Sequence, residues 1–536
     1  HYISSSLDIS AYGWTQFVGW VLAIVATFMM IGLLMKTSDT NSPKDGQINS
    51  ESSSLTNSGS SNHSVNTWKN VGLSFGITSI LIIIYFVFSS PTVISRWTEG
   101  DYLLITTILA LVITVFIIMI SIFPHFISRL DLRLLWVWNG LFVALLIGTI
   151  LLNQIPFLFT PPIYPLFAPP TTFLHHLLLI LVLILSPVIL VDFTLLSRVL
   201  IESKPTTTSL GGSFVLSSLF FLLMIFANIF TTTYDYIPIV GPLFRDMIWF
   251  VYLIVVLAVA LPIFLIKKTS LNFQKPIINL QTKVIVIILV AILLGTFGGV
   301  LVTSPLPTEP GSVTSIKVLT YNILQGNNEY GIKNFDGQLE LLRNIDADII
   351  GLQESDPARI AGGNSDVVRF FANNLHLYSY YGPKTVTGTF GIALLSKYPI
   401  LNVTTFYMYS EGEQTAAIEA QITIDSKMFN VFVTHLGNGG PLVQQETFLQ
   451  EINGKSNVIA MGDFNFRPYT TQYNLTTGVL DDSWLLKWST GDDGSGINSN
   501  ERIDHIFVSS GTIILDSRFI LSVNSDHPAL WTEIQI

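Results

Sequence analysis

The eleven residues VIAMGDFNFRP, from Val458 to Pro468, decide how the second half of this chain is interpreted. They begin with an apolar run typical of a buried strand. The run ends in Gly462, Asp463, Phe464 and Asn465, so a carboxylate and an amide follow directly on the strand. Yet the stretch belongs to a chain that is 50% hydrophobic and only 12% charged. That composition is too apolar for one water-soluble domain.

Most of the apolar residues lie in long runs before Pro305. Each run is close to the roughly 20 residues that a membrane-spanning helix needs. Buried helices of a large water-soluble protein are the alternative, but these runs are too long, too numerous and too poor in charge. We predict about eight transmembrane helices, at Trp14–Met35, Val71–Phe88, Tyr102–Phe123, Leu134–Leu152, Leu177–Val199, Ser213–Thr233, Met247–Ile266 and Val284–Val302.

Composition also sets the domain boundaries. Residues 1–303 form the predicted membrane domain, in which a Ser/Asn/Gly-rich segment at 37–68 is predicted to be a flexible loop. The Pro-rich residues 304–314 form a linker, and residues 315–536 form a second domain. From residue 311 onward, 13 Lys+Arg face 24 Asp+Glu, a net charge of −11. The chain has no cysteine, so a metal ion must be held by Asp, Glu, Asn or His.

The distribution of Lys and Arg predicts the orientation in the membrane. One set of alternate loops carries Lys36, Lys44, Lys69, Arg129, Arg133, Arg198, Lys204, Lys267, Lys268, Lys275 and Lys283. The other set carries only Arg96 and Arg245. Positively charged loops face the cytoplasm, so we expect a multi-pass membrane protein whose C-terminal domain is extracytosolic, in a lumen or outside the cell.

The C-terminal domain alternates strand-like and helix-like segments, which predicts a layered α/β sandwich. Polar residues follow its apolar strands and should gather at one rim of the sheets. They are Asn322, Glu354, His435, Asp463, Asn465, Asp504, His505, Asp526 and His527. Any one of them alone is more simply a turn residue. The complete ordered set is improbable by chance and indicates a catalytic site.

The ordered motifs TYNIL, GLQE, THLG, GDFN, RIDHI and SDH resemble the endonuclease/exonuclease/phosphatase superfamily, over nearly all of Ile316–Ile536. The resemblance implies a four-layered α/β sandwich and a metal-dependent phosphoesterase. It implies that Glu354, with Asn322 and Asp526, binds Mg²⁺, with Mn²⁺ as the alternative.

The resemblance also assigns catalytic roles. Asp463 takes a proton from the attacking water, and Asn465 orients the phosphate. His435 and His527 bind phosphate oxygens or protonate the leaving group. Asp504 polarises an imidazole, whereas His505 is expected to pack structurally.

The layout, a multi-pass membrane half followed by such a domain, resembles the family that remodels the lipid of glycosylphosphatidylinositol (GPI) anchors. That family comprises fungal ceramide-installing proteins and their animal counterparts. The resemblance implies a membrane lipid or lipid-anchored glycan as substrate and a lipid-remodelling membrane protein as partner.

The membrane half contains polar residues of its own. Asp192 lies inside a predicted span, where an acid is costly; it either has a function or pairs with Arg198 near the cytosolic end. By the predicted orientation, four more residues face the extracytosolic side and are candidates for binding a lipid headgroup: His175, His176, Asp235 and Arg245. Ordinary interfacial residues are the alternative for each.

Three functions remain in competition. The first is a membrane-tethered, Mg²⁺-dependent phosphodiesterase or transferase acting on a phosphate-containing lipid, in GPI-anchor or related glycolipid or sphingolipid remodelling. The second is a membrane-anchored extracytosolic nuclease, which the charge of −11 disfavours, because nucleic acids bind clustered Lys and Arg. The third is a non-catalytic scaffold of a lipid-remodelling complex, which the complete set of polar residues disfavours.

Overall fold

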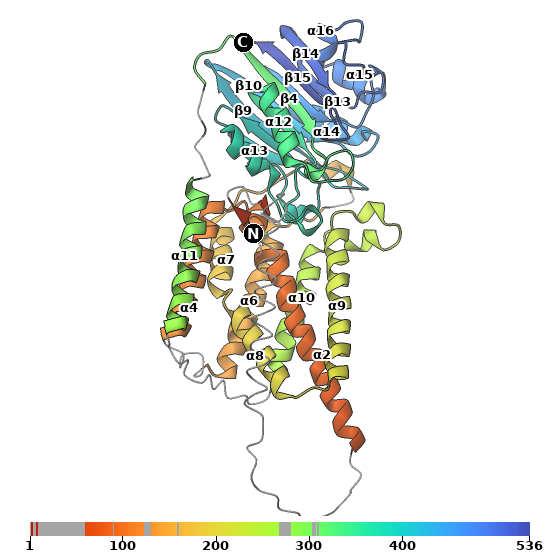
Figure 1. The fold of residues 1–536 in the computed structure, drawn as a ribbon. Helices are drawn as coiled ribbons and strands as arrows, with labels where there is room; N and C mark the ends of the chain where they lie inside the picture. The colour runs from red at the N-terminus through yellow and green to blue at the C-terminus, as the bar shows by residue number, and fades with distance from the viewer. Residues whose placement is uncertain are drawn as a thin grey trace, which may run out of the picture.

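The chain folds into a helical half and an α/β domain that sits on one end of the helices (Figure 1). This computed structural model describes residues 2–3, 7–8, 59–88, 90–122, 130–157, 160–266, 280–302, 307 and 310–536. The predicted span Trp14–Met35 and most of the predicted loop at 37–68 lie outside these residues. Residues 59–68 of that loop are helical instead, because the first long helix continues past its apolar part.

Apolar runs form the helical half, as the composition predicts. Its helices are α2 (Gly59–Ile83, continued by the π-helical turn η3, Ile84–Phe88), α3 (Pro91–Thr98), α4 (Tyr102–Ile122), α6 (Leu132–Asn153), α7 (Phe173–Leu185), α8 (Val188–Glu202), α9 (Thr207–Phe230), α10 (Ile248–Leu265) and α11 (Leu280–Val302). Within the described residues, five helical segments are long and apolar enough to cross a membrane. The helices Ile248–Phe264 and Val286–Gly295 are shorter apolar candidates. The total of eight spans stays a prediction.

The C-terminal domain contains two sheets. The first has the strand order β12-β13-β11-β10-β9-β8-β3 and the second β14-β15-β4-β5-β7-β6. The strands are β3 (Leu166–Phe167), β4 (Ser315–Asn322), β5 (Ile349–Gln353), β6 (Tyr378–Tyr381), β7 (Ile392–Ser396), β8 (Leu401–Met408), β9 (Thr415–Ile424), β10 (Lys427–His435), β11 (Val458–Asp463), β12 (Leu480–Asp482), β13 (Asp504–Ser509), β14 (Ile514–Ile520) and β15 (Ala529–Gln535).

Three apolar layers make this domain a four-layered sandwich, which confirms the predicted fold class. Strand β4 illustrates the alternation: Val318 faces the core between the sheets, whereas Leu319 faces the helices. Outside the second sheet lie α12 (Phe335–Ile345) and α13 (Val367–Leu375), and outside the first lie α14 (Leu442–Ile452) and α15 (Thr471–Thr477). The short helix α16 (Ser483–Lys487) packs on β14 and β13.

The helical half contributes directly to the first sheet. Strand β3 belongs to the connection between α6 and α7, and it pairs antiparallel with β8 through Leu166↔Tyr407 and Phe167↔Phe406. Nearby, the ring of Phe157 packs 5.1 Å from that of Tyr407. The membrane half therefore covers what would otherwise be an edge strand, which is one way that proteins protect sheet edges.

Candidate active site

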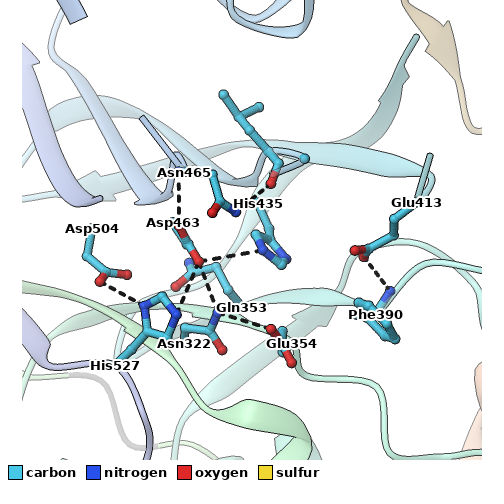
Figure 2. Close-up of polar contacts among 12 residues, drawn as sticks. Asn322, Gln353, Glu354, Phe390, Glu413, His435, Asp463, Asn465, Asp504 and His527 are labelled. Carbon is cyan, nitrogen blue, oxygen red and sulfur yellow. Dashed lines mark hydrogen bonds and ion pairs between the residues drawn. The ribbon is translucent and has the colours of Figure 1, made fainter. Parts of the chain in front are cut away.

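Strand register brings the predicted residues into a row. Strands β10 and β11 run parallel with His435 opposite Asp463, and β11 and β13 run antiparallel with Asp463 opposite Asp504. In the other sheet, parallel β4 and β5 place Asn322 opposite Gln353, directly before Glu354. The polar residues that follow separate apolar strands thus meet at one rim of the sandwich (Figure 2).

The buried carboxylate of Asp463 lies at the centre of this row. The Asn322 amide donates a hydrogen bond to its Oδ2 over 3.1 Å. The Nε2 atoms of His435 and His527 each lie 3.6 Å from that same oxygen. The backbone N–H of Asn465 donates to Oδ1 over 3.0 Å and so fixes the other oxygen. Asp463 is therefore held between two imidazoles, a geometry suited to moving a proton.

His527 forms a second ion pair with Asp504. Its Nδ1 lies 2.9 Å from Asp504 Oδ2, which leaves Nε2 facing Asp463. Burial alone would lower the pKa of His527, but Asp504, helped by Asp463, raises it to about 10. Burial also raises the pKa of Asp504 to about 6, against the opposing effect of the imidazolium. His527 is thus a cation at neutral pH and can bind a phosphate oxygen or supply a proton.

His435 and Glu354 lie on the opposite side of Asp463 from Asp504 (Figure 2). Burial opposes the charge on His435, but Asp463 and two glutamates raise the pKa of its imidazole. Burial raises the pKa of the Glu354 carboxyl. The Asn322 amide lies 3.4 Å from Glu354 Oε1 and thus bridges Glu354 and Asp463.

Two of the site residues lie in the left-handed backbone region. Glu354 has φ 47° directly after β5, and Asn465 has φ 54° two residues after Asp463. Asparagine tolerates this region, whereas glutamate adopts it at a cost of about 1–3 kcal/mol. Such strain is typical of functional sites, where it turns a side chain toward its partners.

These residues fit a hard divalent cation. Several carboxylates meet in a small buried space, and Asp504 Oδ1 is buried without a hydrogen-bond partner in the described part of the chain. Among the described residues, neither Glu354 nor Asp463 is paired with Lys or Arg. Asp463, Asp504 and His527 each place one potential ligand atom within 4.8 Å of the others. Because His527 is protonated, the oxygen ligands are the better donors, and oxygen ligands suit Mg²⁺.

Three other predicted residues have side chains that form no hydrogen bond or ion pair with Asp463 in the described part of the chain. Asp526 is exposed beside His527, and the Asn465 amide donates to Leu436 O over 2.9 Å. His505 is fully buried among aromatic rings and hydrogen-bonds Phe466 O. The prediction that it packs structurally therefore agrees with its position.

Of the five candidates in the membrane half, two lie next to the site. Asp192 lies in α8 and accepts a hydrogen bond from Asn139 over 3.0 Å, rather than pairing with Arg198, which binds Glu202. His175 caps α7 together with Thr172, and His176 is exposed next to it. Asp235 and Arg245 hydrogen-bond the loop between β8 and β9, at the rim of the site. Their role in substrate binding stays a prediction.

The sequence analysis missed Glu413. Its carboxylate accepts a hydrogen bond from Phe390 N over 3.3 Å, and it lines a small cavity together with His435. Burial raises the pKa of Glu413 to about 8. No sequence motif marked Glu413, which stands in the loop before β9. Because β9 runs antiparallel to β10, its beginning lies at the same rim as the end of β10.

Fold and site together define a class: an endonuclease/exonuclease/phosphatase-like domain that follows apolar helices. Residues 314–481 match the family model described as "PGAP2IP, C-terminal nuclease-like domain". The chain is also 36% identical over 114 residues to the protein cwh43 of Schizosaccharomyces pombe, a match that covers 20% of this chain and 12% of that protein. Residues 314–481 are thus similar to a nuclease-like domain family, and the chain spans about an eighth of the length of the curated relative that it matches.

The solved structures found to be similar share little sequence with this chain. The endonuclease/exonuclease/phosphatase from Beutenbergia cavernae is 15% identical, with 42% of this chain and 72% of that chain covered and a TM-score of 0.35. The human Nocturnin catalytic domain, with a bound sulfate anion, is 18% identical, with 41% and 94% covered and a TM-score of 0.34. These likenesses are too distant to assign a substrate.

Proposed function

We propose that this protein is a membrane-tethered, metal-dependent phosphodiesterase or transferase that acts on a phosphate-containing lipid. GPI-anchor remodelling, or remodelling of a related glycolipid or sphingolipid, is the process that fits best. One observation carries this proposal: the catalytic rim of the sandwich faces the helical half rather than open solvent (Figure 1).

Contacts next to Glu354 support that orientation. Asp356, two residues after Glu354, lies 3.7 Å from Arg96 of α3 and 2.6 Å from Arg359. Arg359 in turn hydrogen-bonds Thr232 at the end of α9, and Asn364 donates to Tyr85 O in η3 over 2.9 Å. A lipid headgroup in the adjacent leaflet would therefore reach the site without leaving the membrane, and tethering raises its effective concentration.

The same contacts support an extracytosolic site. The domain docks on the ends of α3, α6 and α9, where Arg96 and Arg245 lie. Lys204 and Arg133 lie at the opposite ends of the helices, after α8 and at the start of α6. By the positive-inside rule, this distribution supports a domain that lies away from the cytoplasm, whatever the number of spans before residue 59.

The proposed chemistry uses the residues in fixed roles. Asp463 accepts the proton of the attacking water or hydroxyl group, and the His435 and His527 side chains bind the phosphate oxygens or protonate the leaving oxygen. Glu354, with Asn322 beside it, would hold a divalent cation that neutralises phosphate charge. A membrane protein of the lipid-remodelling machinery is the partner that this proposal implies.

Purified full-length protein in mixed lipid micelles tests the proposal. With Mg²⁺, it should release a headgroup or exchange a lipid moiety faster than it nicks plasmid DNA. A chelator should remove the activity, and readdition of Mg²⁺ should restore it. Faster cleavage of the plasmid would replace the lipid proposal with the nuclease. Inactivity of the wild type on every lipid and on DNA would favour the scaffold.

A further inference from the structure

The connection between α9 and α10 is hydrogen-bonded to the loop that joins β8 to β9. Five hydrogen bonds link the two segments. Tyr234 OH donates to Gly412 O over 2.8 Å, and Glu413 N donates to the Asp235 carboxylate over 2.8 Å. Arg245 donates the other three, to Ser410 O over 2.8 Å, Glu411 O over 3.1 Å and Gln414 Oε1 over 3.3 Å. We call this set of contacts the clamp. It joins the membrane half to the loop that carries Glu413.

The β8–β9 loop extends to the candidate active site. Glu413 and His435 line one cavity of about 10 Å³, which is room for roughly one water molecule. Glu413 and His435 are close enough for the charge on either one to affect the pKa of the other. Glu413 thus lies near His435 but does not contact it directly, unlike Asp504, which is hydrogen-bonded to His527 (Figure 2).

A second contact binds the α9–α10 connection to the site. The Tyr236 ring lies 6.3 Å from that of Phe390, whose backbone N–H bonds Glu413. The Tyr236 hydroxyl lies close to the side chain of Asn438, three residues after His435. Both loops that flank the cavity are therefore in contact with the same short segment of the membrane half.

We propose that the α9–α10 connection is a positioning element of the catalytic site, acting through Glu413 on His435. The inference rests on the proposed phosphodiesterase or transferase chemistry and adds a role for the membrane half beyond tethering. A displaced Glu413 would change the cavity that its carboxyl group and His435 line together. Displacement of a catalytic group by about 1 Å costs up to roughly a hundredfold in rate. The loss should fall on kcat, with KM little changed, because His435 acts mainly in the transition state.

The clamp can be replaced by a covalent bond. A Cβ atom built on Gly412 lies 3.8 Å from Asp235 Cβ, which is close to the usual separation in a disulfide. The chain contains no cysteine, so the double variant Asp235→Cys/Gly412→Cys can form only this one bond within the molecule. Loss of the Asp235 carboxylate removes the hydrogen bond from Glu413 N, and oxidation should link the two segments again through the disulfide.

The assay uses the full-length double variant in micelles, with bis(p-nitrophenyl) phosphate as a small soluble phosphodiester. In the reduced form, kcat should be about ten- to a hundredfold below wild type. Oxidation should restore most of it. In the triple variant that adds Glu413→Gln, oxidation should restore nothing. The matched control Arg198→Ala, which breaks an exposed pair with Glu202, should keep the wild-type kcat.

Two results would overturn the inference. The first is failure of the disulfide to form in folded protein, which would mean that the two loops are not in contact. The second is turnover at the wild-type rate by both the reduced and the oxidised form, which would mean that the contact does not position the site. If the wild type cleaves this phosphodiester but no lipid, the lipid proposal fails while the clamp is still tested. If the wild type cleaves neither this phosphodiester nor a lipid, the lipid proposal and the proposed role of the clamp are both wrong.

Discussion

Replacing Asp504 with Asn should make kcat decrease as the pH rises from 6 to 7.5, because His527 would then lose its proton in this range. Asp504 Oδ2 lies 2.9 Å from His527 Nδ1, and the pKa of His527 is raised to about 10 in its presence. Without that carboxylate, the pKa should fall toward the ordinary value of about 6.5. Asn keeps the size of the side chain and can still accept the Nδ1 hydrogen bond, so the ring should stay in place.

The size of the effect follows from the shift. With a pKa of about 6.5, roughly one imidazole in eleven is protonated at pH 7.5 and about three-quarters at pH 6.0. If the cationic form is required, Asp504→Asn should lose up to about tenfold in kcat at pH 7.5, but only about 1.3-fold at pH 6.0. Asp463, 3.6 Å from Nε2, still favours the cation, whereas burial opposes it, so the ordinary pKa serves as the reference for this figure.

The assay is the ratio of variant to wild-type kcat, measured between pH 6 and pH 8.5. Asp516→Asn is the matched control, because Asp516 binds the exposed Arg518 away from the site. The titration midpoint of His527, followed by NMR, provides a second readout. A ratio that is constant with pH, or an unchanged midpoint, would refute the role of Asp504.

Three further predictions concern the fold around the site. His505 is buried, and burial lowers its pKa to about 4. As the pH falls from about 6.5 to about 4, the unfolded chain binds a proton at His505 that the folded chain does not bind. The free energy of unfolding should therefore decrease over this range by up to about 3 kcal/mol. His505→Phe should remove this part of the pH dependence, measured by hydrogen exchange of β11 and β13; an unchanged slope would contradict it. Gly462→Ala should disrupt the pairing of β10 with β11, because the new Cβ would lie 2.1 Å from Thr434 O, whereas Gly478→Ala meets nothing closer than 3.3 Å. Limited proteolysis should distinguish the two, and equal resistance would count against the register. Phe157→Ala should weaken docking of the domain by about 3 kcal/mol, seen as faster hydrogen exchange in β8, unlike the exposed Phe173→Ala; equal exchange would contradict the docking.

Much of the fold could be predicted because its signals are local. Apolar length marks helices, and an apolar run that ends in a carboxylate marks a strand at a catalytic rim. The GDFN stretch placed Asp463 and Asn465 this way, and strand pairing then brought His435 and Asp504 beside Asp463.

The rest depends on contacts between distant parts of the chain. Nothing in the two residues of β3 indicates a strand, and they adopt one only because β8 offers a free edge. Glu413 precedes its strand, so its place in the site depends on the antiparallel pairing of β9 with β10. Likewise, Asp235 and Arg245 look like ordinary interfacial residues until the β8–β9 loop is placed against them. Sequence patterns carry no direct information on such partners.

The central claim is that Asp463 and its neighbours process a lipid of the membrane in which the chain resides. The most direct measurement is quantitative lipidomics of cells that lack the protein, compared with cells given back the wild type or Asp463→Asn at equal abundance. The account predicts that wild type alone restores the composition of one class of phosphate-containing lipid or lipid anchor, and that Asp463→Asn matches the deficient cells. Full restoration by Asp463→Asn, or no lipid difference between deficient and wild-type cells, would contradict it.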